Sequence, residues 1–203
     1  FNSSFSNNNR SIIFWDGIIN SNQGGGGHTN FTNILINNSN IAIDLEPDDG
    51  VWTQEVRFKD LIIINSTDYD VYDNRQSGTS AYAYFLNATY NISKEYESSD
   101  YLVRQWYYSA YVNDTDGNNV SNANITAYDV FGTKQFNLTT NSNGLTGTAI
   151  ITDYIYDGGD RTYFSNYTIN ASNSTYLNKS GSYNVTFNQN NNQINLEKNI
   201  ERT

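Results

Sequence analysis

Three phenylalanines, Phe31, Phe58 and Phe85, stand 27 residues apart in the first half of the chain, and each begins a similar short segment. An Asn or Asp follows each phenylalanine two positions later and an apolar residue comes next, while a weaker copy begins at Phe14. A repeat of about 20 to 50 residues with one short strand per period is typical of a solenoid, because each turn buries its apolar face only by stacking on the next. We therefore predict three or four rungs of a parallel β-helix over residues 11–95, against the alternative of a β-sandwich with similar strands.

The second half of the chain lacks this period and alternates short apolar runs with turn residues. Runs of Tyr, Ile, Val, Thr and Phe predict strands, and the clusters of Asn, Gly, Asp and Ser between them predict turns. Seven such strands in about 95 residues are typical of an antiparallel sandwich of immunoglobulin-like (Ig-like) type. Residues 93–102, the one segment with a helical pattern, are expected to form a loop or a single turn. The predicted strands cover residues 104–112, 120–130, 135–140, 145–156, 161–170, 182–188 and 193–198.

Asparagine accounts for 34 of the 203 residues, and many asparagines begin the N-glycosylation acceptor sequence Asn-x-Ser/Thr. Because Ser and Thr make up about one-fifth of the chain, chance would give about six or seven such sequons. The enrichment favours N-glycosylation over the alternative of a generally polar sequence. The chain has sixteen sequons, at Asn2, Asn9, Asn30, Asn37, Asn65, Asn87, Asn91, Asn113, Asn119, Asn124, Asn137, Asn166, Asn170, Asn173, Asn178 and Asn184.

Several sequons alternate with apolar residues inside predicted strands, in residues 123–127, 136–139, 167–171 and 183–187. Successive side chains of a strand point to opposite faces, so these asparagines are expected to point away from the core, where a bulky glycan can be attached. The pattern predicts a secreted, N-glycosylated protein of the cell surface, with N-linked glycans in place of any cofactor.

The composition excludes several classes of protein. The chain has no cysteine, which rules out disulfides, thiol nucleophiles and Cys-ligated metals, and it has a single histidine, His28. A net charge of −10 repels phosphate backbones, so we expect no nucleic acid as a partner. The apolar runs, such as residues 61–64, are far shorter than the roughly 20 residues that span a bilayer, so direct membrane insertion is not expected. Because the chain begins at Phe1, we expect a processed or excised segment.

Acidic turns are the one sign of a metal site, because oxygen-rich turns of this kind can bind Ca²⁺. None has the full spacing of an EF-hand loop, and acidic turns are mostly solvated, so Ca²⁺ remains a weak expectation and no residue is assigned as a metal ligand. The acidic residues concerned are Asp44, Glu46, Asp48 and Asp49, then Asp68, Asp70 and Asp73, and finally Asp114 and Asp116.

Catalysis and sugar binding are the competing functions. A polysaccharide-degrading enzyme needs paired carboxylates or a base, and Asp16, Asp48, Asp49 and Asp60 are the candidates, but the basic residues near them are dispersed. We therefore expect no enzyme activity and assign no catalytic residue. Residues 24–27 are four consecutive glycines, which indicate a connector and not a phosphate loop. Either a sugar-stacking platform or ordinary core packing is compatible with the aromatic residues Trp52, Trp106, Tyr107, Tyr108 and Tyr111.

The segments 102–108, 112–125 and 139–144 resemble the carboxypeptidase-regulatory-like sandwich. They resemble in particular the version that follows right-handed parallel β-helix repeats in archaeal adhesin-like and S-layer-associated surface glycoproteins, to which residues 64–73 and 163–172 are also similar. The resemblance covers residues 31–200 and is strongest over 102–172. At Asn119 the family usually has proline, and this departure loosens a turn and creates a sequon.

The resulting organisation has three parts, namely an N-terminal arm with its glycine-rich connector (1–28), parallel β-helix rungs (29–101) and an Ig-like β-sandwich (102–203). The predicted function is that of a non-catalytic structural or adhesive protein of the extracellular cell surface. Its expected partners are copies of itself, in a filament or surface layer formed by β-strand pairing, and other surface proteins or glycans. The arm is expected either to cap the first rung or to donate its strand to a neighbouring copy. The alternatives are a carbohydrate-binding module and a polysaccharide-degrading β-helix enzyme.

Overall fold

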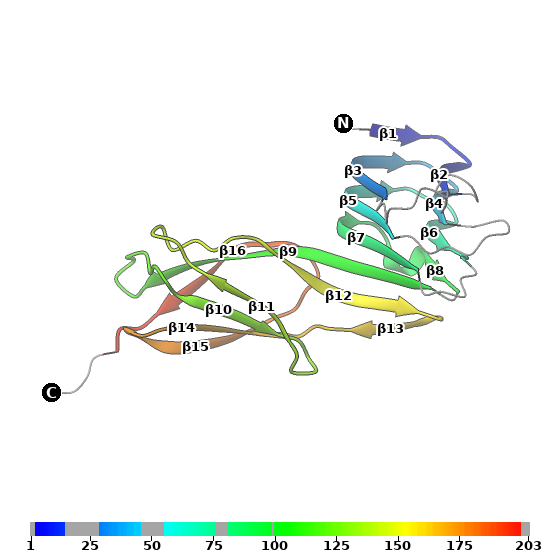
Figure 1. Ribbon diagram of the computed structural model, residues 1–203. Helices are drawn as coiled ribbons and strands as arrows, with labels where there is room; N and C mark the ends of the chain where they lie inside the picture. Colours follow the sequence, from blue (N-terminus) through cyan, green and yellow to red (C-terminus); the bar gives the residue numbers. More distant parts are fainter. Residues whose placement is uncertain (1–2, 15–28, 46–54, 76–80, 99, 200–203) are drawn as a thin grey trace, which may run out of the picture. The chain divides into compact units, whose positions relative to one another are not determined.

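A computed structural model describes residues 3–14, 29–45, 55–75, 81–98 and 100–199 (Figure 1). These residues form an all-β structure with several sheets, so the all-β class predicted from the sequence is confirmed. The helical content of the described residues is one 3₁₀ turn, η1 (Ile92–Lys94). It covers only the start of the segment 93–102 that was expected to be a loop or a single turn, because strand β8 follows at once and β9 begins at Tyr101. The strands are β1 (Ser3–Ser6), β2 (Arg10–Phe14), β3 (Thr29–Asn37), β4 (Ile41–Leu45), β5 (Val56–Ile64), β6 (Tyr69–Asp73), β7 (Tyr82–Thr89), β8 (Glu95–Glu97), β9 (Tyr101–Asp114), β10 (Asn124–Tyr128), β11 (Lys134–Thr139), β12 (Ala149–Asp157), β13 (Asp160–Tyr163), β14 (Tyr167–Asn173), β15 (Tyr176–Tyr183) and β16 (Gln189–Leu196).

The chain divides into two compact units. Unit 1 contains Phe1–Gln105 together with Tyr154–Thr162, and unit 2 contains Trp106–Asp153 together with Tyr163–Thr203. The long strand β9 begins in unit 1 and continues into unit 2, and β12 runs back from unit 2 into unit 1. Unit 1 is therefore completed by a hairpin that comes from the second half of the sequence.

Strands of unit 1 alternate between two parallel sheets. The first sheet runs in the order β1, β3, β5, β7 and β9 and continues with β12 and β13, and the second contains β2, β4, β6 and β8. Each strand pairs in parallel with the strand two places further along the chain, and Figure 1 shows the two resulting rows. Parallel strands need a crossover connection. Here a strand of the other sheet lies within each crossover.

The phenylalanine repeat sets the register of the first sheet. Phe31 is the neighbour of Phe58, and Phe58 is the neighbour of Phe85, so residues 27 apart lie side by side. Their rings stack with centroids 5.3 and 5.0 Å apart and interplanar angles of 18° and 16°. Phe58 and Phe85 are fully buried. The alignment of these repeats, predicted from their spacing, is confirmed.

Other inward side chains extend the same core. In the first sheet Ile34 and Leu61 are neighbours and both are buried, and in the second sheet Ile43 and Val71 are neighbours with no exposed surface. These residues belong to one apolar cluster, which Tyr154 from the hairpin also joins. Burial of apolar surface at about 25 cal/mol per Å² makes this cluster the main source of stability in unit 1.

The weaker repeat at Phe14 is not equivalent to the other three, and this expectation was wrong. Phe14 pairs with Leu45 in the second sheet, whereas the strand that precedes β3 in the first sheet is β1, where Phe5 is the neighbour of Ile36. Three positions after Phe14 the sequence has Gly17 where the other repeats have an apolar residue, and a degenerate copy of this kind does not specify which sheet it joins. Residues 15–28, which include the four glycines and His28, lie outside the described residues.

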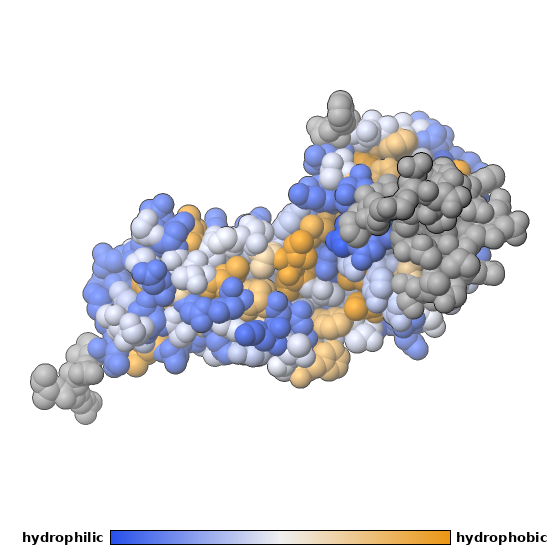
Figure 2. All heavy atoms as spheres, in the orientation of Figure 1, coloured by the Kyte–Doolittle hydropathy of each residue, from blue (hydrophilic) through white to orange (hydrophobic). Residues whose placement is uncertain are grey.

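Unit 2 is built on an antiparallel sheet in the order β11, β10, β14 and β15. Its buried face carries Ile125 and Ala127 from β10 and Ile169 from β14, which pack in one cluster with Tyr108 and other residues of β9. Strand β16 pairs in parallel with β9. Apolar side chains also reach the surface of this unit, for example Phe131 at 64% exposure, and Figure 2 shows hydrophobic patches among hydrophilic ones on the face in view.

Two strand predictions in unit 2 need correction. The predicted strand 161–170 is split into β13 and β14, because the Phe164 backbone bonds to Asp153 and Val130 between them. The predicted strand 182–188 lies mostly beyond β15, which ends at Tyr183. The amide of Val185 donates to Ser165 Oγ at 2.9 Å, so a side chain replaces the strand partner there. The alternating pattern of 183–187 therefore indicated the burial of Tyr183 and Val185 correctly, but it did not indicate pairing correctly, and Phe187 is 59% exposed.

Candidate functional site: an asparagine-rich surface with a groove

Most sequon asparagines lie at the surface. Among the fifteen that the structure describes, nine are exposed, five are half-buried and one is buried, while Asn2 lies outside the described residues. The half-buried asparagines are Asn37, Asn87, Asn124, Asn170 and Asn173. The exposed asparagines are Asn9, Asn30, Asn65, Asn91, Asn119, Asn137, Asn166, Asn178 and Asn184.

The alternation predicted for the sequons within strands is confirmed by the burial of their neighbours. Asn184 is exposed between the buried residues Tyr183 and Val185, and Asn137 is exposed between two half-buried residues of β11. The same alternation gives half-buried asparagines at Asn124 and Asn170, each between buried apolar residues. The acceptor nitrogens of such residues are on the side of the strand away from the core.

Asn113 differs from the other described sequon asparagines. It lies in β9 with 8% of its surface exposed, and its Oδ1 accepts a hydrogen bond of 3.4 Å from Gln193 Nε2 of β16. A glycan on this nitrogen would have to displace part of the packing around β9. We therefore do not expect a glycan on Asn113.

A ladder of asparagines lines one corner of unit 1, where the chain leaves the first sheet. Asn7, Asn38 and Asn65 follow β1, β3 and β5 and have φ values of 56°, 54° and 58°. Asn38 Nδ2 donates to Asn7 Oδ1 at 3.3 Å, and Asn65 Nδ2 donates to Asn37 Oδ1 at the same distance. Asparagine tolerates this left-handed conformation better than most residues. The abundance of asparagine therefore also has a structural cause.

A second ladder runs through the strands of the first sheet. Asn33, Asp60 and Asn87 have φ values of 55°, 56° and 53°, and Asn87 Nδ2 donates to Asp60 Oδ1 at 2.6 Å. These are the residues two positions after Phe31, Phe58 and Phe85. The repeat thus specifies a left-handed residue in each strand, which is why Asn or Asp recurs there.

A groove of about 540 Å³ lies beside the second ladder on the outer side of the first sheet. Its lining includes Asn33, Asp60 and Asn87 from the ladder together with the aliphatic side chains of Leu35 and Ile62. Leu35 is 40% exposed and Ile62 is 47% exposed, although both belong to strands. The lining residues all belong to unit 1.

The acidic turns do not gather into a metal site in the described part of the chain, where no group of three or more metal-ligating side chains occurs. Protein cations occupy several of these carboxylates instead. Lys198 Nζ lies 3.5 Å from Asp114 and 3.0 Å from Asp116, and Arg10 Nη1 lies 2.6 Å from Asp44. Asp70 accepts a backbone hydrogen bond of 2.7 Å from Asn91. Glu46, Asp48 and Asp49 lie outside the described residues, as does Asp16.

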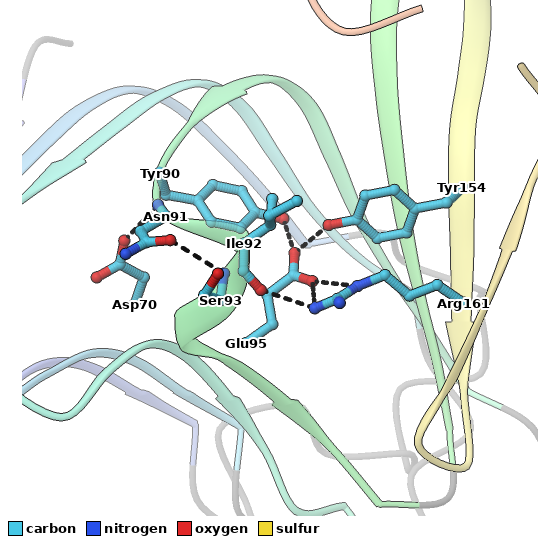
Figure 3. Close-up of polar contacts among 8 residues, drawn as sticks. All are labelled: Asp70, Tyr90, Asn91, Ile92, Ser93, Glu95, Tyr154 and Arg161. Atoms are coloured by element: carbon cyan, nitrogen blue, oxygen red, sulfur yellow. Dashed lines mark hydrogen bonds and ion pairs between the residues drawn. The ribbon is translucent and has the colours of Figure 1, made fainter.

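A buried carboxylate, Glu95, holds the hairpin of β12 and β13 within unit 1 (Figure 3). The hydroxyls of Tyr90 and Tyr154 both donate to Glu95 Oε1, and Arg161 Nη2 donates to Oε2 at 2.7 Å. Arg161 Nη2 also donates to the carbonyl of Ile92 at 2.7 Å. The Glu95 side chain has no exposed surface. This cluster joins residues more than 60 positions apart and fixes the hairpin against η1 and β8.

The electrostatics of this cluster keep its tyrosines protonated. Burial raises the pKa of Tyr90 and Tyr154 well above the ordinary value, and the negative charge of Glu95 raises it further. The guanidinium of Arg104 lies 4.9 Å from the centroid of the Tyr90 ring. Burial opposes the charge of Arg104, but the surrounding tyrosines and Glu95 raise its pKa overall. Hydroxyl donors and a charged guanidinium thus persist throughout the physiological pH range.

A second buried ionic cluster lies at the end of β6. Arg75 Nε donates to Asp73 Oδ1 at 2.7 Å, and Arg75 Nη2 donates to Oδ2 at 2.6 Å, a bidentate pair with no exposed side-chain surface. Asp100 Oδ2 lies 3.6 Å from Arg75 Nε. The turn at Asp73 therefore binds an arginine of the same chain.

The aromatic residues considered for a sugar platform are divided between core and surface. Trp106 and Tyr108 are buried in the core of unit 2, so they do not form a platform. Tyr107 and Tyr111 are half-buried, and the Tyr111 hydroxyl donates to Asn119 Oδ1 at 2.8 Å. Trp52 lies outside the described residues.

Sequence reasoning did not single out Glu95, Arg161 or Arg75. In the second sheet Glu95 is the neighbour of Val71, at an inward position that is apolar in the preceding strands. Strand alternation in Glu95-Tyr96-Glu97 points both glutamates to the inward face. A buried carboxylate needs a partner, so this pattern was a signal that the sequence offered. Arg161, the partner of Glu95, comes from a distant hairpin, and no local pattern indicates this pairing.

The structure has no helix in its described part that is long and apolar enough to cross a membrane. No protein-family model, curated protein or solved structure matches the chain.

Proposed function

We propose that the chain is an extracellular, N-glycosylated structural or adhesive segment of a cell surface. The observation that carries the proposal is that nine of the fifteen described sequon asparagines are exposed. They occur in both units, for example at Asn30 and Asn65 in unit 1 and at Asn137 and Asn184 in unit 2. A sugar at each would cover much of the surface with hydrophilic groups while the core stays undisturbed.

The finer architecture is part of this proposal. We infer that β1 to β9 form a short parallel β-helix and that unit 2 is an Ig-like sandwich of the carboxypeptidase-regulatory-like type. Two parallel sheets with stacked repeats support the first assignment, and an antiparallel sheet packed on β9 supports the second. This order of modules is that of the archaeal adhesin-like and S-layer-associated surface glycoproteins that residues 31–200 resemble. Such proteins are extracellular, which is consistent with a cysteine-free, sequon-rich chain.

Glycan occupancy should follow exposure. When the chain is secreted by a host that N-glycosylates, we expect Asn137 and Asn184 to carry glycans and Asn113 to carry none, because Asn113 is buried whereas Asn137 and Asn184 are exposed. Intact mass before and after glycan release measures the total, and mass spectrometry of peptides assigns the sites.

Two matched threonine variants provide the control for occupancy. Thr139→Val removes the sequon of Asn137 and should lower the intact mass by one glycan, whereas Thr115→Val removes the sequon of Asn113 and should leave the glycan mass unchanged. An intact mass equal to that of the bare polypeptide would contradict the proposed function.

Self-assembly by strand pairing is the proposed way in which copies join. Among the described residues, β1 pairs only with β3 and β2 pairs only with β4, so both parallel sheets end in an edge strand at the same end of unit 1. Edge strands offer unpaired backbone groups to another chain. Ser3, Ser4 and Ser6 of β1 are exposed, and no charged side chain in this short strand blocks the approach of another strand.

Lysines on this edge are expected to prevent assembly. Ser3→Lys with Ser6→Lys places two charges on β1. Because charged edge strands resist pairing, the glycosylated double variant should stay monomeric at concentrations where the glycosylated chain without these substitutions forms larger species. Light scattering over a concentration series measures this. The control is Ser142→Lys with Thr148→Lys, at exposed residues of unit 2 that lie outside its strands, which should assemble normally. Equal assembly by both double variants would exclude β1 as the contact.

Carbohydrate binding is a second candidate function, and the groove is the observation that favours it. Amide and carboxylate groups of Asn33, Asp60 and Asn87 stand beside an aliphatic floor of Leu35 and Ile62. Sugars present hydroxyl edges and apolar faces, which match such a lining. Hydrolysis of a glycosidic bond uses a pair of carboxylates, so binding is the favoured role of this groove over catalysis.

A further inference from the structure

Two apolar side chains of the first sheet, Leu35 and Ile62, are exposed to solvent in the groove of unit 1. Leu35 of β3 and Ile62 of β5 are direct neighbours, and Thr89 of β7 continues the same row. Leu35 and Ile62 are 40% and 47% exposed, and all three residues line the groove. The two adjacent aliphatic side chains therefore give the groove an apolar floor that a ligand can cover.

The shape of the groove follows from the second ladder. At Asn33, Asp60 and Asn87 the backbone leaves the extended conformation for φ values of 53° to 56°, and the register passes directly from Thr32↔Lys59 to Ile34↔Leu61. The same interruption in consecutive strands aligns the bends across the sheet. The aligned bends form a hollow that runs across the strands, with polar ladder groups on one side and the aliphatic row on the other.

One glycan acceptor is built into this groove. Asn87 lines it and begins the sequon Asn87-Ala88-Thr89, whose threonine also lines it. Attachment joins Asn87 Nδ2 to C1 of a sugar, breaks the bond from C1 to the phosphate of a lipid-linked oligosaccharide donor and releases one amide proton. The nitrogen keeps its second hydrogen. This hydrogen can continue to bond Asp60 Oδ1, now 2.6 Å from the nitrogen.

We propose that the N-linked glycan of Asn87 folds back into the groove and covers Leu35 and Ile62. The inference rests on the proposed function, because it requires glycosylation. The first sugars leave the acceptor nitrogen within the groove itself, so their apolar faces can lie on the aliphatic row while their hydroxyls bond Asn33, Asp60 and Thr89. A volume of about 540 Å³ lies within the range of about 300–1,000 Å³ that is usual for ligand pockets. Asn87 is thus both a modification site and the anchor of an intramolecular ligand.

The test compares two glycans on the secreted full chain. Methyl groups of Leu35 and Ile62 should show nuclear Overhauser effects to sugar protons. A peptide glycosidase should release the Asn87 glycan about tenfold more slowly than the glycan of Asn184, which is exposed on the surface of unit 2. Thr89→Val keeps the shape of the side chain and Asn87 but abolishes the sequon, so these methyl contacts should disappear. Thr186→Val, the same change at the Asn184 sequon, should leave them intact.

The possible failures are distinguishable. An occupied Asn87 whose glycan contacts neither methyl group and is released as fast as that of Asn184 overturns the inference, and so does an empty Asn87 beside an occupied Asn184. Both results leave the proposed function standing. An empty chain, with no glycan at any sequon, overturns both. Binding of the freed oligosaccharide to Thr89→Val, with loss of that binding in Thr89→Val/Ile62→Asp, would support the groove as the sugar site.

Discussion

Replacing Arg75 with methionine is expected to destabilise unit 1 by about 3–5 kcal/mol, the usual cost of breaking a buried ion pair by removing one partner. Methionine fills much of the same space but leaves the carboxylate of Asp73 buried without its bidentate donor. Asp100 lies beside the same guanidinium, so a second negative charge loses compensation. Urea denaturation combined with hydrogen exchange of β5 amides measures the loss in unit 1.

The loss caused by Arg75→Met should depend on pH. Burial raises the pKa of Asp73 above its ordinary value of 3.8, although Arg75 lowers it. An acid whose pKa is raised by folding binds more protons in the folded state, so its contribution to stability grows as pH falls through the folded pKa. Removing Arg75 raises that pKa further. The variant should therefore be less destabilised at about pH 5 than at about pH 8.

Arg57→Met is the matched control for Arg75→Met. Arg57 also pairs with a carboxylate, Glu55 at 2.6 Å, but the two side chains are 39% and 30% exposed. Exposed pairs contribute about 0–1 kcal/mol, so this variant should lose little stability and show no comparable recovery at lower pH. Equal losses in the two variants would mean that Asp73 and Arg75 are hydrated in solution.

The periodic part of the fold was predictable because stacking repeats one environment. Phe31, Phe58 and Phe85 recur at constant spacing since each must pack on its counterpart in the next strand. The Asn or Asp two positions later was also visible in the sequence. Its left-handed conformation was not, because that conformation is seen only in the folded sheet. The 27-residue period therefore specifies which residues are neighbours in the sheet. It does not specify the backbone angles of those residues.

The ionic clusters were not predictable, because their partners come from separate parts of the chain. Asp73 stood in an acidic turn that suggested Ca²⁺, yet an arginine two residues later folds back on it. Arg161 was placed in a strand of the sandwich, but the hairpin of β12 and β13 carries it into unit 1, where it bonds Glu95. Charge spacing along the sequence does not reveal such pairings, since an isolated carboxylate and a paired one have the same local pattern.

The asparagines have two roles in this chain, as proposed glycan acceptors in sequons and as residues with a left-handed backbone. As sequons they predicted an outward face, and the alternation around Asn184 and Asn137 agrees with that prediction. In the two ladders they supply left-handed backbone, as at Asn38 and Asn33, neither of which is a sequon acceptor. Asn65 and Asn87 belong to both sets. Enrichment of sequons above chance therefore overstates the selection for glycans in unit 1, and unit 2 provides the cleaner test of occupancy.

Phe58 is the central ring of the phenylalanine stack. Phe58→Ala should destabilise unit 1 by about 3–5 kcal/mol, because Phe58 is fully buried and its ring lies 5.3 and 5.0 Å from those of Phe31 and Phe85, so its loss leaves a cavity that the strands on both sides cannot fill. Hydrogen exchange of β3 and β7 should accelerate together, since each loses the same stacking partner. Phe187→Ala, at a site with 59% exposure, should change stability by less than about 0.5 kcal/mol. A loss of under about 1 kcal/mol in Phe58→Ala would mean that the repeat sets register without holding the sheets together, and the parallel stack would then depend on its ionic clusters.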